Sequence, residues 1–270
     1  MPRASCFAPA SRSASESLSR FDRSRKARLR RETLCELVFR PLAHVVVLAL
    51  APLRVPPPAV VLAWMAVGIG GAVELARGHL VVAALLVQLK TVLDNADGQL
   101  ARLTRRVTVF GRYLDAECDL LVNSALFAAL GWFTQRPVIA AVGFAALTFV
   151  LSINFNVERL ARGVRASTDP SVLGRVYSVL YGWQDRAVER FVDRRTRDGD
   201  AGRYHDTFTV SVLANLGMST QLAVFGVFLA LGRPLDYVWL LVAEVVVVVM
   251  LFARRETLMR SNREVVLEHR

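Results

Sequence analysis

The sequence Leu93-Asp94-Asn95-Ala96-Asp97-Gly98-Gln99-Leu100-Ala101-Arg102 ends one long apolar stretch, and Gly111-Arg112-Tyr113-Leu114-Asp115-Ala116-Glu117-Cys118-Asp119 begins the next. Asp94 and Asp97 are three residues apart, and Asp115 and Asp119 are four apart, so each pair lies on one face of a helix. The short connection 103–110 makes the two helices antiparallel neighbours. The sequence therefore predicts four carboxylates close together at the junction of two apolar helices.

Six stretches are long and apolar enough to cross a bilayer, which takes about 20 residues. They are 57–77, 79–102, 111–133, 137–157, 208–231 and 235–254. Hydrophobic residues make up 54% of the chain and charged residues 21%, and the two kinds are segregated, which excludes a disordered chain. Three scattered cysteines exclude a disulfide scaffold.

The predicted fold is an all-α, polytopic membrane protein with six transmembrane helices preceded by an amphipathic interfacial helix. That first helix covers 32–56, where apolar residues recur at helical spacing around Pro41. We expect 1–31 to be a disordered basic tail, 57–254 to be the six-helix domain, and 255–270 to be a second tail. A long insertion, 158–206, carries apolar residues at helical spacing between 176 and 191, which predicts a surface helix there.

The net charge of +11 is a topology signal, because the basic residues lie between the apolar stretches. With six spans, 30 Lys and Arg residues fall on the side of both termini, and only Arg77, Arg136 and Arg233 fall on the other. Cytoplasmic loops are enriched in Lys and Arg. We therefore expect a multi-pass protein of the cell (inner) membrane, with the termini and the aspartates cytoplasmic, and no nucleic-acid partner.

The clustered aspartates require a positive partner, because one charge in the membrane costs at least about 2.5 kcal/mol. Lys90, one turn before Asp94, can neutralise one charge but not four. Ligands that are all oxygen, with no His or Cys, select Mg²⁺ or Mn²⁺, and four carboxylates suggest two ions. Spacing alone leaves a second interpretation open, in which these acids are solvated helix ends paired with Arg102, Arg105, Arg106 and Arg112.

The pattern Asp94-x2-Asp97-Gly98-x2-Ala101-Arg102-x8-Gly111-x3-Asp115-x3-Asp119 resembles the signature of the class I CDP-alcohol phosphatidyltransferase family. The resemblance implies an integral membrane enzyme that transfers a phosphatidyl-type group from a CDP-alcohol, such as CDP-diacylglycerol, to a hydroxyl acceptor and releases CMP in phospholipid biosynthesis. It implies that Asp94, Asp97 and Asp115 ligate two Mg²⁺ or Mn²⁺ ions. Asp119 would approach the second ion and act as the catalytic base, and the enzyme would be a homodimer.

The resemblance also implies a CDP-binding set made of Gly98, Ala101, Arg102, Thr108 and Gly111. For Gly98 and Ala101, spacing alone leaves tight helix packing equally open. One departure concerns 55–61, which lacks the Asn and Thr that the family commonly carries there and so puts the identity of the donor in doubt. The acceptor is not disclosed, although Asn154, Asn156 and Arg159 are candidate contacts.

Two other functions compete with this one. An intramembrane prenyltransferase also uses Asp-rich helices and Mg²⁺ on a diphosphate, but it gives no reason for Gly98, Ala101 and Arg102. A divalent-cation transporter predicts further acids at mid-membrane, where only Glu244 qualifies. Glu244 is either functional or paired with a polar residue such as Gln221.

Overall fold

The computed structural model describes residues 32–164, 171–195 and 206–268, and all regular structure in these ranges is helical. The predicted all-α class is therefore confirmed for the described part of the chain. The basic tail predicted at 1–31 lies outside the described residues. The helices that make up the bundle are α3 (Pro57–Ala76), α4 (Leu80–Leu103), α5 (Val109–Thr134), α6 (Pro137–Ala161), α9 (Thr207–Ala214), α10 (Met218–Ala230) and α11 (Pro234–Glu268).

Helix boundaries follow from prolines, glycines and capping side chains. Pro56 is extended, and α3 starts directly after it with two prolines in its first turn, where no amide hydrogen is needed. Gly78, at φ +82°, allows the tight turn from α3 into α4. Thr108 accepts a hydrogen bond from the amide of Gly111 and caps the start of α5. These local signals make α3, α4 and α5 consecutive antiparallel helices.

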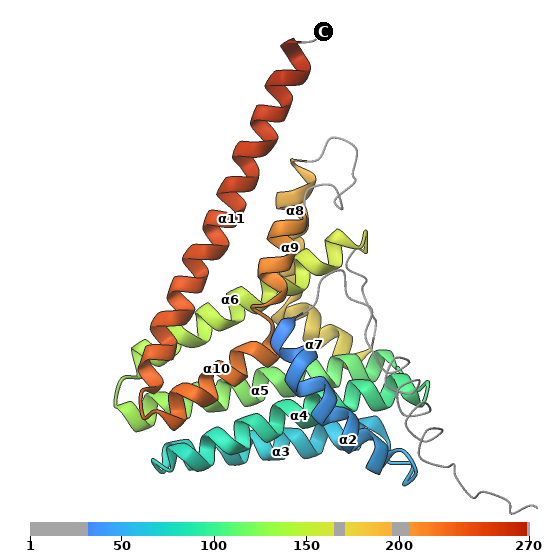
Figure 1. The fold of residues 1–270 in the computed structure, drawn as a ribbon, viewed down its shortest axis with the longest axis vertical. Coiled ribbons are helices and arrows are strands. Elements are labelled where there is room, and N and C mark those ends of the chain that lie inside the picture. The colour runs from blue at the N-terminus through green and yellow to red at the C-terminus, as the bar shows by residue number, and fades with distance from the viewer. Residues whose placement is uncertain (1–31, 165–170, 196–205, 269–270) are drawn as a thin grey trace, which may run out of the picture.

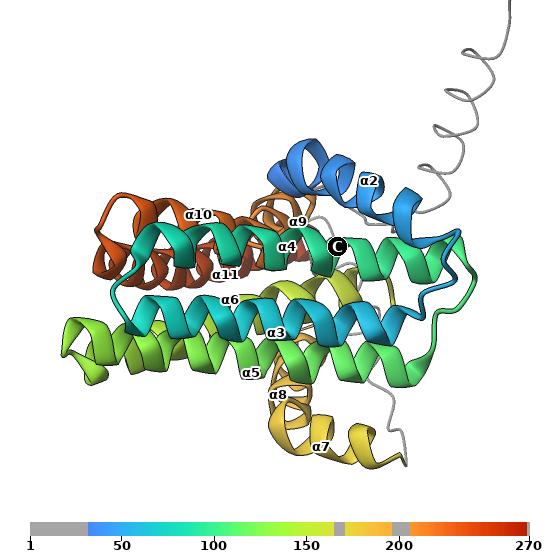
Figure 2. The same ribbon diagram turned by 90° about the horizontal axis from the view of Figure 1, so that it is seen from below.

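Helices α3, α4 and α5 lie side by side in both views of the molecule (Figures 1 and 2). Helix α10 packs on α4, α6 packs on α5, and α11 packs on α6 and α10. The core between them is built around large buried side chains from four different helices, namely Trp64, Leu126, Phe225 and Tyr237. The acidic ends of α4 and α5 meet at one end of this bundle.

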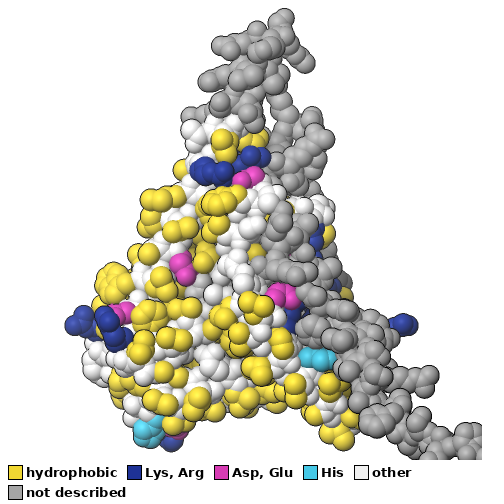
Figure 3. Space-filling model, in the orientation of Figure 1, with side chains coloured by type: hydrophobic (Ala, Val, Ile, Leu, Met, Phe, Trp, Pro, Cys, Tyr) yellow, Lys and Arg dark blue, Asp and Glu magenta, His cyan; other side chains and the backbone are white. Residues whose placement is uncertain are grey.

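The surface of the bundle is covered with apolar side chains of a kind that water-soluble proteins do not expose in such numbers. Val81, Leu85, Leu121 and Phe149 are all more than 40% exposed. The face drawn in Figure 3 is largely hydrophobic, with its charged side chains in a few separate places. The chain is therefore a membrane protein.

Among the described residues, α3, α5, α6 and residues Pro234–Met259 of α11 are each long and apolar enough to cross a membrane. A fifth candidate is α9 with α10, which are bent by 45° at 215–217, where the sequence predicted one straight span over 208–231. Asn215 and Gly217 favour such a break. Helix α4 is as long as the others but carries Lys90, Asp94 and Asp97. The structure thus gives four or five apolar spans, and six stays a prediction.

The chain before the bundle forms a short π-helical turn, η1 (Cys35–Phe39), which continues as α2 (Arg40–Leu50). This segment lies across α4, and the side-chain amide of Gln99 donates a hydrogen bond to the backbone oxygen of Arg40. Ala43 and Val47 are buried against α4, whereas Leu42 and Val45 are exposed. The placement of this helix at a membrane surface stays a prediction.

Two later segments differ from the sequence expectation. The insertion forms two short helices, α7 (Val172–Leu180) and α8 (Gly182–Asp193), instead of one continuous surface helix. They are fixed to the bundle, because α7 packs on α5 and α8 on α6. Helix α11 continues to Glu268, past the expected end of the last span at 254. Most of the predicted second tail is therefore helical.

Glu244, the acid in the middle of the last span, has a partner. The side-chain amide of Gln221 donates a 2.6 Å hydrogen bond to Glu244, and the Tyr237 hydroxyl donates one of 3.1 Å to Gln221. Of the two roles considered for Glu244, the structure shows the paired one.

Candidate metal centre

Three of the four predicted aspartates come together. One carboxylate oxygen from each of Asp94, Asp97 and Asp115 lies within 4.8 Å of the other two. Asp94 and Asp97 stand on one face of α4, and Asp115 faces them from the first turns of α5. The predicted convergence of carboxylates from two antiparallel helices is confirmed for these three residues. The expectation that the two helices are direct neighbours is wrong, because α4 and α5 each pack on α3 instead of on each other.

Trp64 of α3 forms one wall of the site, a role that the sequence did not indicate. Its indole nitrogen donates a 2.5 Å hydrogen bond to Oδ2 of Asp97, and both side chains are buried. A buried indole nitrogen needs an acceptor, so this bond serves both residues. Helix α3 therefore fixes the orientation of the Asp97 carboxylate.

Asp119 lies beside the group of three and is held by Lys90. The Lys90 ammonium donates to Oδ1 of Asp119 at 2.5 Å and to Oδ2 of Asp94 at 3.0 Å. Lys90 is only 1% exposed, and its ammonium lies 4.2 Å from the centre of the Trp64 ring. The single neutralising charge expected from Lys90 is thus present and is shared between α4 and α5.

Gly98 and Arg102 lie together on α4. A Cβ atom at Gly98 would stand 3.2 Å from Nη1 of Arg102, so the guanidinium folds back over the glycine. Both residues are partly exposed, one turn and two turns after Asp94. A planar guanidinium suits a diphosphate, and its position here is compatible with that expectation.

The other residues of the predicted nucleotide set have structural roles of their own. Thr108 caps α5 through the amide of Gly111, 3.0 Å away, and a Cβ at Gly111 would approach the same hydroxyl to 3.1 Å. Ala101 is partly exposed beside Arg102 on α4. The capping hydrogen bond explains Thr108 and Gly111 without a ligand, and their contact with a nucleotide stays a prediction.

Asn95, between the first two aspartates, ties the site to its surroundings. Its side-chain amide donates to the hydroxyl of Ser219 on α10, at 3.1 Å, and its oxygen accepts from the thiol of Cys35 at 3.2 Å. Glu32 reaches the start of α10 and accepts from the amide of Thr220 at 2.8 Å. The segment before α2 and the start of α10 are thereby held against the acidic end of α4, on a different side from the aspartates.

Helices α7 and α8 cover the same end of the bundle from the other side. The Tyr113 ring of α5 packs on Tyr177 of α7 with centroids 5.2 Å apart. Burial, and then the carboxylates of Glu117 and Asp119, raise the pKa of Tyr181 above its usual value. The Tyr181 phenol therefore stays protonated and can donate a hydrogen bond near the acidic group.

Arg159, a candidate acceptor contact, is engaged in holding α8. Its guanidinium donates to Asn156 at 2.7 Å and forms ion pairs with Glu189 at 3.0 Å and Asp185 at 3.7 Å. These contacts join the end of α6 to α8. They give Arg159 and Asn156 a positioning role at this end of the molecule.

The donor set fits a hard divalent cation. All potential ligand atoms in the group of three are carboxylate oxygens, the type that Mg²⁺ and Mn²⁺ prefer. Oδ1 of Asp115 is buried and has no hydrogen-bond partner among the described residues. Buried polar atoms are rarely left without a partner, so this oxygen points to a ligand.

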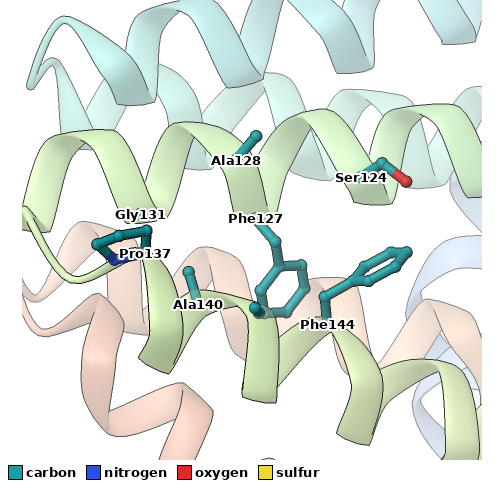
Figure 4. Close-up of a pocket in the computed structure, with 8 residues that line it drawn as sticks. Ser124, Phe127, Ala128, Gly131, Pro137, Ala140 and Phe144 are labelled. Atoms are coloured by element: carbon teal, nitrogen blue, oxygen red, sulfur yellow. The ribbon is translucent and has the colours of Figure 1, made fainter.

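The described residues also line a pocket of about 200 Å³ between α5 and α6. Its wall includes the rings of Phe127 and Phe144, together with Ala140 and Pro137 (Figure 4). None of the lining residues is charged, and none belongs to the group of three aspartates. A nucleotide diphosphate therefore does not belong in this pocket.

The chain matches a known protein family over about half of its length. Residues 42–180 match the family described as CDP-alcohol phosphatidyltransferase, and the match includes the whole motif and both helices that carry it. The chain belongs to this family. The expected resemblance is confirmed, and the four aspartates lie within the residues that match the family.

Individual relatives share shorter regions. A phosphatidylinositol phosphate synthase from Corynebacterium glutamicum is 34% identical over 116 residues, which are 43% of this chain and 51% of that protein. Another from Mycolicibacterium smegmatis is 40% identical over 28% of this chain and 35% of that protein. A bifunctional IPC transferase and DIPP synthase from Thermococcus kodakarensis is 33% identical over 29% of this chain and 18% of that protein. The chain thus spans about half the length of these relatives or less. No solved structure matches it.

Proposed function

We propose that this member of the CDP-alcohol phosphatidyltransferase family transfers a phosphatidyl-type group from CDP-diacylglycerol to a hydroxyl acceptor, with release of CMP. The observation that carries the proposal is the convergence of Asp94, Asp97 and Asp115 within 4.8 Å inside the family motif. A cluster of carboxylates by itself does not indicate phosphatidyl transfer. The same three carboxylates inside the family motif, next to Gly98 and Arg102, support it.

The three converging carboxylates would hold the divalent cation, either Mg²⁺ or Mn²⁺. When bound, the cation would offset the charge of the diphosphate and stabilise the departing CMP. Arg102 would bind the diphosphate from the α4 side, and Gly98 would leave space beside it for the nucleotide. Trp64 would keep the Asp97 carboxylate oriented through its indole hydrogen bond.

Asp119 would be the base that takes the proton of the attacking hydroxyl. Lys90 holds Oδ1 of Asp119, so Oδ2 is the atom proposed to accept that proton. The contact with Lys90 also keeps this carboxylate in a fixed orientation. The reaction would then need only an acceptor hydroxyl placed between Asp119 and the donor phosphorus.

An anionic cyclitol is the first acceptor to test. Two of the three relatives described above are named phosphatidylinositol phosphate synthases. By analogy, inositol phosphate would be the acceptor here. Glycerol phosphate, serine and unphosphorylated polyols complete the acceptor panel.

We also propose that α4 is a membrane span, which brings the total to six. Its exposed residues Val81, Leu85 and Leu89 form one apolar stripe, whereas Lys90 and Asp97 face the protein interior. The charges of α4 are therefore hidden from lipid, although they lower its overall hydropathy. The cytoplasmic position of both termini and of the aspartates, together with the homodimer implied by the family, belongs to the same proposal.

The assay measures CMP release by the purified protein in lipid nanodiscs supplied with Mn²⁺, CDP-diacylglycerol and each acceptor in turn. Asp119→Asn should abolish CMP release while the protein stays folded. Asp236→Asn, an exposed residue paired with Arg233 far from the site, is the matched control and should keep full turnover. Unchanged turnover in Asp119→Asn would remove that residue as the base.

The same preparation tests the competing functions. A prenyltransferase would release diphosphate from a prenyl diphosphate, and a transporter would move Mn²⁺ into sealed vesicles. Glu244, the acid on which a transport function would depend, is hydrogen-bonded to Gln221 between α10 and α11. Absence of CMP with every acceptor would reject the proposed transfer.

A further inference from the structure

Lys90 is a buried cation inside an acidic group. It is 1% exposed, and its ammonium contacts two of the four motif carboxylates, Asp119 at 2.5 Å and Asp94 at 3.0 Å. The ring of Trp64 lies 4.2 Å away on a third side. A buried ammonium is costly unless it is paired and hydrogen-bonded, and both conditions are met here.

The stem of Lys90 is held as firmly as its charged end. A Cβ atom at Gly68 would stand 3.3 Å from Cγ of Lys90, so the lysine packs directly on the α3 backbone. Trp64 is one turn before Gly68 on the same helix. Because α3 confines the lysine in this way, the ammonium cannot swing out of the space between α4 and α5.

The ammonium divides the four aspartates into two sets. Asp94, Asp97 and Asp115 each offer one oxygen within 4.8 Å of the others, and Asp119 is not a member of that group. The oxygen that Asp119 turns toward α4 is occupied by Lys90. A second divalent ion placed between Asp94 and Asp119 would need the position that the ammonium already fills.

We propose that Lys90 is a resident cation that replaces one of two divalent ions, so that the free enzyme binds a single Mg²⁺ or Mn²⁺ at Asp94, Asp97 and Asp115. This inference rests on the proposed function, because it specifies how many metal ions the same site holds. With all four aspartates ionised, the group carries four negative charges and, on Lys90, one positive charge. One divalent ion leaves a single net negative charge, whereas two would leave this buried group net positive.

The proposal gives Asp119 a defined position. Its carboxylate is oriented by an internal ammonium instead of by an ion that exchanges with solvent. Lys90 is therefore a positioning residue that acts through Asp119, and it needs no contact with the substrate. The number of divalent ions that the Lys90 variant binds distinguishes this role from a purely structural one.

The test counts bound Mn²⁺ by electron paramagnetic resonance of the free ion, with chelator-stripped protein in nanodiscs and no donor present. Wild-type protein should bind one ion, and Lys90→Met, which keeps the side-chain length but removes the charge, should bind two. Asp97→Asn should lower the affinity for the ion by roughly 100-fold or more, because a direct ligand is lost. Asp119→Asn should still bind one ion.

Two ions in the wild-type protein, or one ion in a folded Lys90→Met variant, would overturn the proposal. If Lys90→Met does not fold, the counts for wild-type protein and Asp119→Asn decide the question by themselves. Failure of the proposed function would look different, because CMP would then be absent with every acceptor while the Mn²⁺ count stayed at one. A count of two with normal CMP release would reject only the role of Lys90.

Discussion

We expect a substitution at Gly98 to change the stability of α4 and the rate of CMP release in opposite directions. The nearest atom to a Cβ at Gly98 would be Nη1 of Arg102, at 3.2 Å, and this is the end of a flexible side chain that can shift. Gly98→Ala should therefore stabilise α4 by about 1 kcal/mol and raise the thermal midpoint measured by intrinsic fluorescence. CMP release should fall roughly 10- to 100-fold, because the methyl group displaces Arg102 and the nucleotide.

Gly70→Ala is the control for this prediction. It lies mid-helix in α3, where the nearest atom to a new Cβ, Cδ1 of Leu86, is 3.9 Å away. It should give the same gain in helix stability with no loss of CMP release. Equal activity in the two variants would show that the space beside Gly98 is not used by the donor.

The site could be predicted from the sequence only where its residues are close along the chain. Asp94 with Asp97, and Asp115 with Asp119, share helix faces by spacing alone. Trp64 is 33 residues away from Asp97, and its contact depends on how α3 is rotated against α4. The hydrogen bond by which Thr108 caps α5 was not predicted, because the motif placed Thr108 only in the nucleotide-binding set. Rotation of one helix about its axis is not encoded in local spacing.

At the scale of elements, the close approach of α3, α4 and α5 depends on Gly68. A Cβ there would stand 2.6 Å from Cγ1 of Val122, a fully buried branched side chain that cannot rotate away. Gly68→Ala should destabilise the protein by about 1–3 kcal/mol, as overpacking in a tight core does. Thermal unfolding in detergent, with Gly70→Ala as the matched control, measures this effect.

Gly68→Ala should also weaken Mn²⁺ binding, because α3 positions Lys90 and Asp97. A lower thermal midpoint with an unchanged Mn²⁺ affinity would show that α3 supports the bundle but not the site. An unchanged midpoint would mean that α3 and α5 can separate at no cost, contrary to the packing described here.

The attachment of α8 to α6 depends on Arg159. Replacing it with alanine leaves Asp185, which is 4% exposed, and Glu189 without their shared partner. Arg159→Ala should make local opening of α7 and α8 easier by about 1–3 kcal/mol, because it removes two charged contacts between α6 and α8. Hydrogen exchange of the amides of 172–193 measures the opening.

Arg162→Ala is the control for Arg159→Ala. Arg162 pairs with Glu158 on its own helix and is 34% exposed, so its loss should change exchange in α7 and α8 very little. Equal exchange in both variants would mean that α8 is held by its apolar contacts and not by these ion pairs.

The helices themselves were predictable, and their interruptions were less so. Apolar length located α3, α5 and α6 within a few residues, because a span needs little else. The bend at 215–217 was missed because Asn215 and Gly217 lie within a stretch that is apolar on average. The division of α7 from α8 at Tyr181 arises from tertiary contacts with α5 and α6, which no local pattern records.

At the scale of the whole molecule, the arrangement separates a lipid-facing exterior from a charged interior at one end. Helix α4 shows both properties, with Leu85 exposed and Lys90 buried only five residues later. A measure of hydropathy averages the two faces, so α4 is not among the four or five apolar spans, although we propose it as the sixth. The distribution of charge between the ends of the helices is the better guide to orientation.

The distribution of Lys and Arg between the two ends of the helices predicts which end faces outward. Arg175 on α7 is exposed at the end that carries the aspartates, and Arg233 is exposed in the turn between α10 and α11. The six proposed spans would place 30 Lys and Arg residues on the first side and three on the other, so only the second should face outward. In a Cys6→Ser background, a membrane-impermeant maleimide should label Arg233→Cys on intact cells, and Arg175→Cys only after permeabilisation. Cys35 and Cys118 are buried and should stay unlabelled, which provides the internal control. The reverse pattern would place the aspartates outside the cell and contradict the proposed cytoplasmic reaction.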